Sequence, residues 1–305
     1  MDTEKLSMKA REKYMKAENE IKKGCCSAPS YETALPSYAK AYVWYKSLKE
    51  TAMVIEISDK IILCNQKIRN YIGIAIQYEN ITDYLTMFAP VHFTDICKYY
   101  ELGQRSFLEI NNINKSASML VKNLKYFDKI KCEDESKYLD IINKIINITN
   151  LFVESDYIYK IDILKIVFPY IVKYTNNSQI ENFIDNMIKV FRQLNQAHNI
   201  HNTMLSNVLY LISIYDIENA TKMLNEYYQL DNFIVTEQCQ MARKILFLCS
   251  GDIQTLNIKE ELGQLLKKNA LHVVIKEIYN KIKNIDIEKI KAMNAQQMYD
   301  ELDIV

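Results

Sequence analysis

The chain has 305 residues, with 38 basic and 38 acidic side chains, so its formal net charge is zero. This balance disfavours bulk nucleic-acid binding, which needs an excess of basic residues. Glycine occurs only 5 times and proline only 4 times. Because barrels and nucleotide-binding loops need glycine-rich turns, the composition favours a mostly helical chain.

Helical periodicity and turn residues predict helices along the whole chain. The first helix ends at Gly24, Pro90 interrupts the chain between two others, and Pro169 lies inside a later one. No stretch alternates apolar and polar residues at strand spacing between turn signals. The sequence therefore predicts an all-α protein. Its expected helices span about 3–23, 30–46, 49–67, 69–87, 92–109, 113–129, 136–152, 156–174, 179–197, 201–214, 217–229, 235–249, 257–268, 270–284 and 286–300.

One spacing of large and small residues recurs in three of these helices. A large residue is followed after three positions by a small one, and then by large ones at intervals of four. The three sets are Tyr31, Ala34, Tyr38 and Tyr42; Ile113, Ser116, Leu120 and Leu124; and Ile217, Ala220, Leu224 and Tyr228. Phe183 takes the small position in a fourth, less regular stretch. The pattern predicts degenerate helical-hairpin repeats, with the small residues buried where two helices come close.

The residues that could carry catalysis or bind a metal are sparse. His198 and His201 lie three apart near a turn, but no Cys, Asp or Glu completes a ligand set around them. The chain has neither a Walker loop nor a G-x-G-x-x-G motif. The carboxylates of "CEDESKYLD" fit a solvated helix start better than acid–base catalysis. We therefore expect a protein that is not an enzyme, with no cofactor, no bound metal and no small-molecule substrate.

Cysteine usage and hydropathy indicate where the chain works. The seven cysteines follow no disulfide or zinc framework, which fits a reducing cytosol. The N-terminus reads as a charged helix rather than a signal peptide. Apolar runs such as "IVFPYIV" are too short to span a bilayer. We expect a cytoplasmic protein.

Two stretches of the chain carry a family resemblance. The segment "AENEIKKGCCSAPSYETALPSYAKAYVWYKSLKE" resembles the first repeat of the soluble NSF-attachment proteins, and it is closest to the gamma type. The segment "YDIENATKMLNEYYQLDNF", followed by "EQCQMARKILFLCSGDIQTL", resembles the later helices of the same family. The middle stretch "INNINKSASMLVKNLKYFDK" fits a middle repeat more loosely.

The resemblance implies a particular fold and domain organisation. The fold is a TPR-like, right-handed array of antiparallel helical hairpins, which forms a twisted sheet of helices and ends in a C-terminal helical bundle. Applied to this chain, it implies one elongated domain over residues 1–305. The hairpin repeats would cover about 1–230 and the bundle about 231–299, with an acidic and apolar tail at 300–305.

The resemblance also implies the function of an adaptor. Such a protein binds SNARE complexes of the syntaxin type and recruits and stimulates the ATPase NSF. The ATPase then takes the SNARE complex apart during vesicle-mediated transport. The partners would be a SNARE complex, an NSF-type ATPase and, peripherally, a membrane surface. Which SNAREs are served, and whether the role is of the alpha or the gamma type, stays open.

The loop after the first helix, "KKGCCSAPS", is a membrane-contact element by this resemblance. Cys25 and Cys26 stand where the family has bulky apolar residues, beside Lys22 and Lys23. Two cysteines offer little apolar area, so we expect unaided insertion to be weak. Reversible palmitoylation would strengthen it. The alternative is that the cysteines are small loop residues without membrane contact.

The C-terminal tail is the element that stimulates NSF by this resemblance. Its acidic and apolar residues are Asp300, Glu301, Leu302, Asp303 and Ile304. Ile304 stands where the family has a penultimate leucine, which leaves the strength of stimulation open. The alternative is a frayed, solvated tail.

A generic helical-repeat scaffold, such as a proteasome-lid-like subunit, is the second candidate. That class should finish in a winged-helix module with short strands. Residues 250–305 show no strand-like alternation, which disfavours it.

Overall fold

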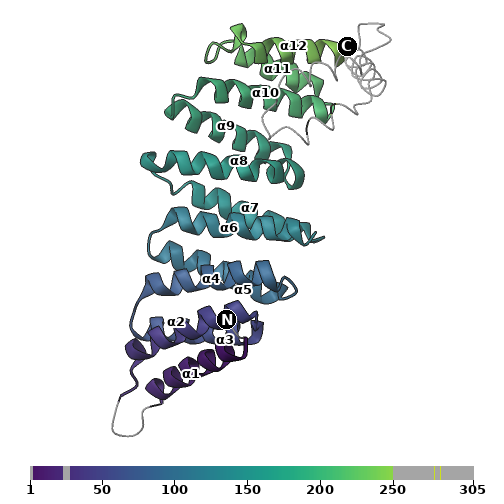
Figure 1. Cartoon of the computed structure of the whole chain (residues 1–305). Helices are drawn as coiled ribbons and strands as arrows, with labels where there is room; N and C mark the ends of the chain where they lie inside the picture. Colours follow the sequence, from purple (N-terminus) through teal and green to yellow (C-terminus); the bar gives the residue numbers. More distant parts are fainter. Residues whose placement is uncertain (1–2, 23–27, 250–277, 279–281, 283–305) are drawn as a thin grey trace. The chain divides into compact units, whose positions relative to one another are not determined.

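The computed structural model describes residues 3–22, 28–249, 278 and 282. Within these residues the chain forms α-helices and two short 3-10 helices but no strand, so the prediction of an all-α protein is confirmed there (Figure 1). Ile278 and Ile282 are also helical and buried. The elements are α1 (Thr3–Ile21), α2 (Tyr31–Leu48), α3 (Thr51–Lys67), α4 (Tyr71–Phe88), α5 (Phe93–Glu109), α6 (Ile113–Lys129), α7 (Glu135–Thr149), η1 (Glu154–Asp156), α8 (Tyr157–Tyr174), α9 (Asn177–Gln193), α10 (Ala197–Ser213), α11 (Ile217–Tyr227), η2 (Phe233–Val235) and α12 (Glu237–Cys249).

The helices fall into two compact units, of which the first ends at Asp156 and the second begins at Tyr157. In the first unit each helix from α1 to α7 packs against the next one in the chain (Figure 1). In the second unit α8 packs against α9, and α10 packs against α9, α11 and α12. The single continuous domain, with a bundle from about residue 231, stays a prediction.

The first unit is built from two layers of helices. In one layer α1 and α3 run parallel, because Tyr14 on α1 donates to Glu56 on α3 and, one turn further along both helices, Glu18 lies 3.0 Å from Lys60. Tyr99 on α5 donates to Asp59 on α3 over 3.0 Å and extends this layer. In the other layer, Lys122 on α6 binds Glu79 and Asp83 on α4. Odd-numbered helices therefore form one layer and even-numbered helices the other.

Six of the turns between helices share one backbone geometry. In each, a non-glycine residue takes a left-handed conformation just after the helix: Lys49, Arg69, Asn111, Lys131, Asn195 or Tyr215. The following N–H then bonds to the carbonyl five residues earlier, as from Cys132 to Phe127 over 3.0 Å. This is the Schellman closure of a helix end, which satisfies carbonyls that the helix leaves free.

The small residues of the recurring spacing are buried, as predicted. Ala34, Ser116 and Ala220 are fully inaccessible to solvent. Ser116 shows the close approach directly, because its hydroxyl donates to the backbone carbonyl of Gln104 on α5 over 3.0 Å. On α9 the larger Phe183 is accommodated by stacking on Phe168 of α8, with ring centroids 5.9 Å apart.

Two details differ from the sequence-based expectation. The expected helix at 179–197 ends at Gln193, because Asn195 turns left-handed and closes the helix, and the next helix already begins at Ala197. In addition, α2 and α6 are four helices apart but α6 and α11 are five apart. The third match of the spacing therefore cannot occupy the same place in a hairpin. The spacing marks the buried face of a helix and not a fixed repeat unit.

Replacing Lys131 by glycine should stabilise the first unit. L-residues pay roughly 1–2 kcal/mol for the left-handed conformation, and glycine pays almost none. Lys131 is exposed with a φ of 53°, so little else should change. We expect the free energy of unfolding to rise by about 1 kcal/mol in a urea titration followed by circular dichroism.

Lys125→Gly is the matched control, because Lys125 is an exposed residue inside α6. Glycine there should destabilise by about 1 kcal/mol. A loss of stability in both variants would contradict the role assigned to the turn.

Candidate functional site

The structure describes only the beginning of the predicted membrane-contact loop. Lys22 follows α1 and its ammonium lies 3.2 Å from the carboxylate of Glu18. Lys23, Cys25 and Cys26 lie outside the described residues, and so does the whole tail from Asp300 to Ile304. The roles assigned to these residues stay predictions.

Glu18 anchors the root of that loop. It is a nearly buried carboxylate that accepts a hydrogen bond from the Tyr38 hydroxyl and pairs with both Lys60 and Lys22. Burial by itself raises the pKa of this carboxyl, but the hydrogen bonds from Tyr38, Lys60 and Lys22 outweigh it and lower the pKa to about 2. The cluster ties α1 to α2 and α3 where the chain leaves α1.

An open cleft separates α5 from α7 in the layer of odd-numbered helices. Its volume is about 340 Å³. Near one end of the cleft, the Lys137 ammonium on α7 lies 4.8 Å from the centre of the Phe93 ring on α5. The floor comes from α6 and the walls from α5 and α7. The lining residues are Phe93, Thr94, Cys97, Glu101, Gln104, Leu120, Asn123, Phe127, Ser136, Lys137, Asp140, Ile141 and Lys144.

The ionisable groups around the cleft do not form a catalytic set. Burial raises the pKa of the Cys97 thiol to about 11, which keeps it protonated and poorly nucleophilic near neutral pH. Asp140 pairs with Lys144 over 2.7 Å and Glu101 pairs with Arg105, each within its own helix. The cleft therefore has an apolar floor and a rim of paired charges, which suits the binding of a protein segment better than chemistry.

Asn123 supplies a polar group at the floor that has no partner. The residue is 7% exposed, and its Oδ1 is buried without a hydrogen bond. Leaving such an acceptor unpaired costs about 1–3 kcal/mol. A ligand with an N–H donor, such as a peptide backbone, could recover that cost. The neighbouring Gln104 uses its amide nitrogen to donate to the Ser116 hydroxyl over 3.1 Å.

The sequence analysis did not find this cleft. The periodicity of α5 places Cys97, Glu101 and Gln104 on one face, and it does the same for Lys137, Asp140 and Lys144 on α7. Periodicity does not reveal that a cleft lies between these two faces. The cleft depends on how α5 and α7 pack on α6, and local sequence does not specify that packing.

The histidine pair of the second unit is engaged in structural contacts. The Nε2 atom of His201 lies 2.7 Å from the Asp231 carbonyl, and that of His198 lies 3.0 Å from the Asn202 amide. Within the part of the chain that the structure describes, no group of three or more His, Cys, Asp and Glu side chains could hold a metal ion.

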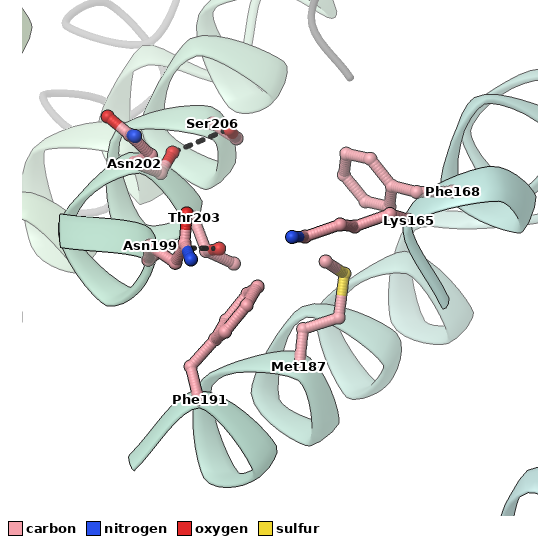
Figure 2. A pocket seen from close by; sticks show the side chains of 8 residues that line it. All are labelled: Lys165, Phe168, Met187, Phe191, Asn199, Asn202, Thr203 and Ser206. Carbon is pink, nitrogen blue, oxygen red and sulfur yellow. Dashed lines mark hydrogen bonds between the residues drawn. The ribbon is translucent and has the colours of Figure 1, made fainter. Parts of the chain in front are cut away.

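A small cavity lies among α8, α9 and α10 (Figure 2). The Lys165 side chain extends between Phe168 and Met187 toward Thr203, and its ammonium lies 5.4 Å from the centre of the Phe191 ring. The hydroxyls here are already used, since Thr203 donates to the Asn199 carbonyl over 2.7 Å. The enclosed space of about 20 Å³ suffices for roughly one water molecule and is too small for a substrate.

None of the helices among the described residues has the length and apolar character that crossing a bilayer requires.

Stability should depend on pH through Glu18. Its folded-state pKa lies below the ordinary value of 4.5, so the stabilisation is present above about pH 4.5 and is lost as the pH falls toward 2. Glu18→Gln should lower the free energy of unfolding by up to about 3 kcal/mol at pH 7, and by much less near pH 2. Urea titrations at both pH values check this. A penalty that is the same at both pH values would show that packing, and not the charge, is responsible.

No family model matches the chain, and no curated protein matches it.

Proposed function

We propose that this chain is a non-enzymatic adaptor of the soluble NSF-attachment type. It would bind SNARE complexes, recruit an NSF-type ATPase and stimulate the disassembly of those complexes in vesicle transport. The sequence resemblance at residues 17–50 and 215–256 supports this proposal. The array of successive antiparallel helices in the first unit is compatible with it.

The finer architecture belongs to the same proposal. The helical hairpins would be TPR-like with a right-handed twist, and the chain would end in a helical bundle. The protein would work in the cytoplasm and reach membranes peripherally, through the loop with Lys22, Lys23, Cys25 and Cys26. Its tail from Asp300 to Ile304 would contact the ATPase.

The observation that carries a binding function is the cleft between α5 and α7. The neighbouring helices of the same layer are joined by buried or half-buried polar contacts. Lys60 on α3 pairs with Glu18 on α1, and Tyr99 on α5 donates to Asp59 on α3. Between α5 and α7 the cleft instead lies over Leu120 and Phe127, which are buried, and over the buried and unpaired Asn123 acceptor. We propose that a helical or extended segment of a partner lies there, with an N–H group donating to Asn123.

A generic helical-repeat scaffold is the second candidate, because an open seam in a helical array would serve any such protein. The two candidates differ in their partner. An adaptor of the proposed type must be retained on an immobilised SNARE complex and must then capture NSF, whereas a generic scaffold would do neither.

Filling the cleft should weaken partner binding. Cys97→Trp places an indole in the cleft. We expect the variant to bind an immobilised SNARE complex roughly tenfold more weakly, because the indole occupies the space that the partner segment would fill. Val43→Trp is the control, because Val43 is an exposed apolar residue on α2. Unchanged retention of the Cys97→Trp variant, at an unchanged thermal midpoint, would remove the cleft from the proposal.

Shortening the penultimate side chain should separate binding from stimulation. Ile304→Ala should leave folding and SNARE-complex binding intact but lower the ATP turnover of NSF at saturating adaptor. Burial of one such side chain in a partner pocket is worth about 1.5–3 kcal/mol, which can shift an activation equilibrium about tenfold or more. Removal of residues 300–305 should act more strongly. Full stimulation by the truncated chain would exclude the tail from the mechanism.

A further inference from the structure

The turn between α4 and α5 presents three apolar side chains to solvent. Met87 is 68% exposed, Phe88 is 44% exposed and Val91 is 87% exposed. They lie within five residues of one another around Pro90, and we call them the apolar tip. Single exposed apolar residues are common on protein surfaces, but three on one tight turn are a local concentration that needs an explanation.

The tip is held in place by α6. The Tyr126 hydroxyl donates to the Pro90 carbonyl over 2.8 Å, and the Lys129 ammonium donates to the Thr86 carbonyl over 2.9 Å. The Phe88 ring also packs on Tyr84, with centroids 5.3 Å apart. The exposed side chains are therefore presented by a fixed backbone. Two of the carbonyls of the turn already have partners within the protein.

Positive charge surrounds the tip. The Lys49 ammonium lies 5.6 Å from the centre of the Phe88 ring, and Lys129 bonds to the turn itself. Neither ammonium forms an ion pair with a carboxylate of the described residues. Of the acidic residues nearby, Asp83 is compensated, because Lys122 binds it over 2.9 Å.

We propose that the apolar tip docks on the surface of an anionic lipid bilayer. Met87, Phe88 and Val91 would enter the interfacial region, while Lys49 and Lys129 would lie among the headgroup phosphates. Apolar side chains in front of unpaired lysines complement an anionic interface. The interior of a bilayer offers no hydrogen-bond partners to backbone groups. The turn suits that environment, because its carbonyls at Thr86 and Pro90 are already paired within the protein. A protein interface would instead be expected to use such groups for hydrogen bonds.

This surface is distinct from the loop with Cys25 and Cys26. Tyr14 on α1 donates to Glu56 on α3, and Glu18 pairs with Lys60 one turn further along both helices, so α3 runs in the same direction as α1. The hydroxyls of Thr51, at the start of α3, and Tyr84, near the end of α4, lie 3.4 Å apart. The tip therefore lies at the opposite end of these helices from the end of α1. The inference does not rest on the proposed adaptor function and can fail or hold separately from it.

Vesicle sedimentation of the full chain, produced without lipidation, tests the proposal. The vesicles contain phosphatidylcholine with or without phosphatidylserine. The parent should sediment with the phosphatidylserine vesicles, and Met87→Ser combined with Val91→Ser should bind them about tenfold more weakly or worse. Both side chains are mostly exposed, so an unchanged thermal midpoint is expected. Lys49→Gln combined with Lys129→Gln should remove the preference for phosphatidylserine.

Two control variants make the result specific. Ile234→Ser combined with Val235→Ser changes another exposed apolar pair, on η2, and should bind like the parent. Cys25→Ser combined with Cys26→Ser measures the separate contribution of the proposed membrane-contact loop, which should be smaller than that of the tip because this chain carries no lipid. The proposal is overturned if the tip variant binds as well as the parent or if the η2 variant loses as much binding. It is also overturned if only the cysteine variant loses binding, or if the tip variant loses retention on a SNARE complex while its vesicle binding is unchanged.

Discussion

From α2 to α7, the packing of each helix on the next depends on a turn that reverses the chain within a few residues. The chain makes most of these turns without glycine, by placing lysine, arginine, asparagine or tyrosine in the left-handed conformation and closing the helix with a bond back over five residues. Each turn fixes the residue at which the next helix starts, and it thereby fixes which way the small buried residues of that helix face. The strain of about 1–2 kcal/mol at each such residue is offset by the helix packing that it permits.

The layers of the first unit differ in how their seams are closed. In the even-numbered layer the Glu79 carboxylate binds both Lys115 and Lys122, and burial is outweighed by these contacts so that its pKa is lowered. In the odd-numbered layer, Lys60 on α3 pairs with Glu18 on α1, and Tyr99 on α5 donates to Asp59 on α3. Between α5 and α7 the charges pair within their own helices instead, and the seam stays open. The candidate binding cleft thus exists because of where the charged side chains find partners.

Much of the fold could be predicted from the sequence, and much of the candidate site could not. The helices before residue 250 appear in the predicted order, and Ala34, Ser116 and Ala220 are buried as expected. The boundary near Gln193 was wrong because a left-handed asparagine is not distinguishable from a helical one in a single sequence. The cleft escaped notice because its residues come from α5, α6 and α7, and each set alone looks like an ordinary helix face.

The helical structure of the described residues follows from local sequence, since periodicity and the scarcity of glycine act within a few residues of each position. The recurring spacing also predicts the buried face of the three helices that carry Ala34, Ser116 and Ala220. Only the tertiary structure decided that α5 and α7 stay apart, that Asn123 is left without a partner, and that Met87, Phe88 and Val91 project from a turn held by Tyr126. These features depend on contacts between residues far apart in the chain, and such contacts are set by the packing of whole helices and not by local sequence.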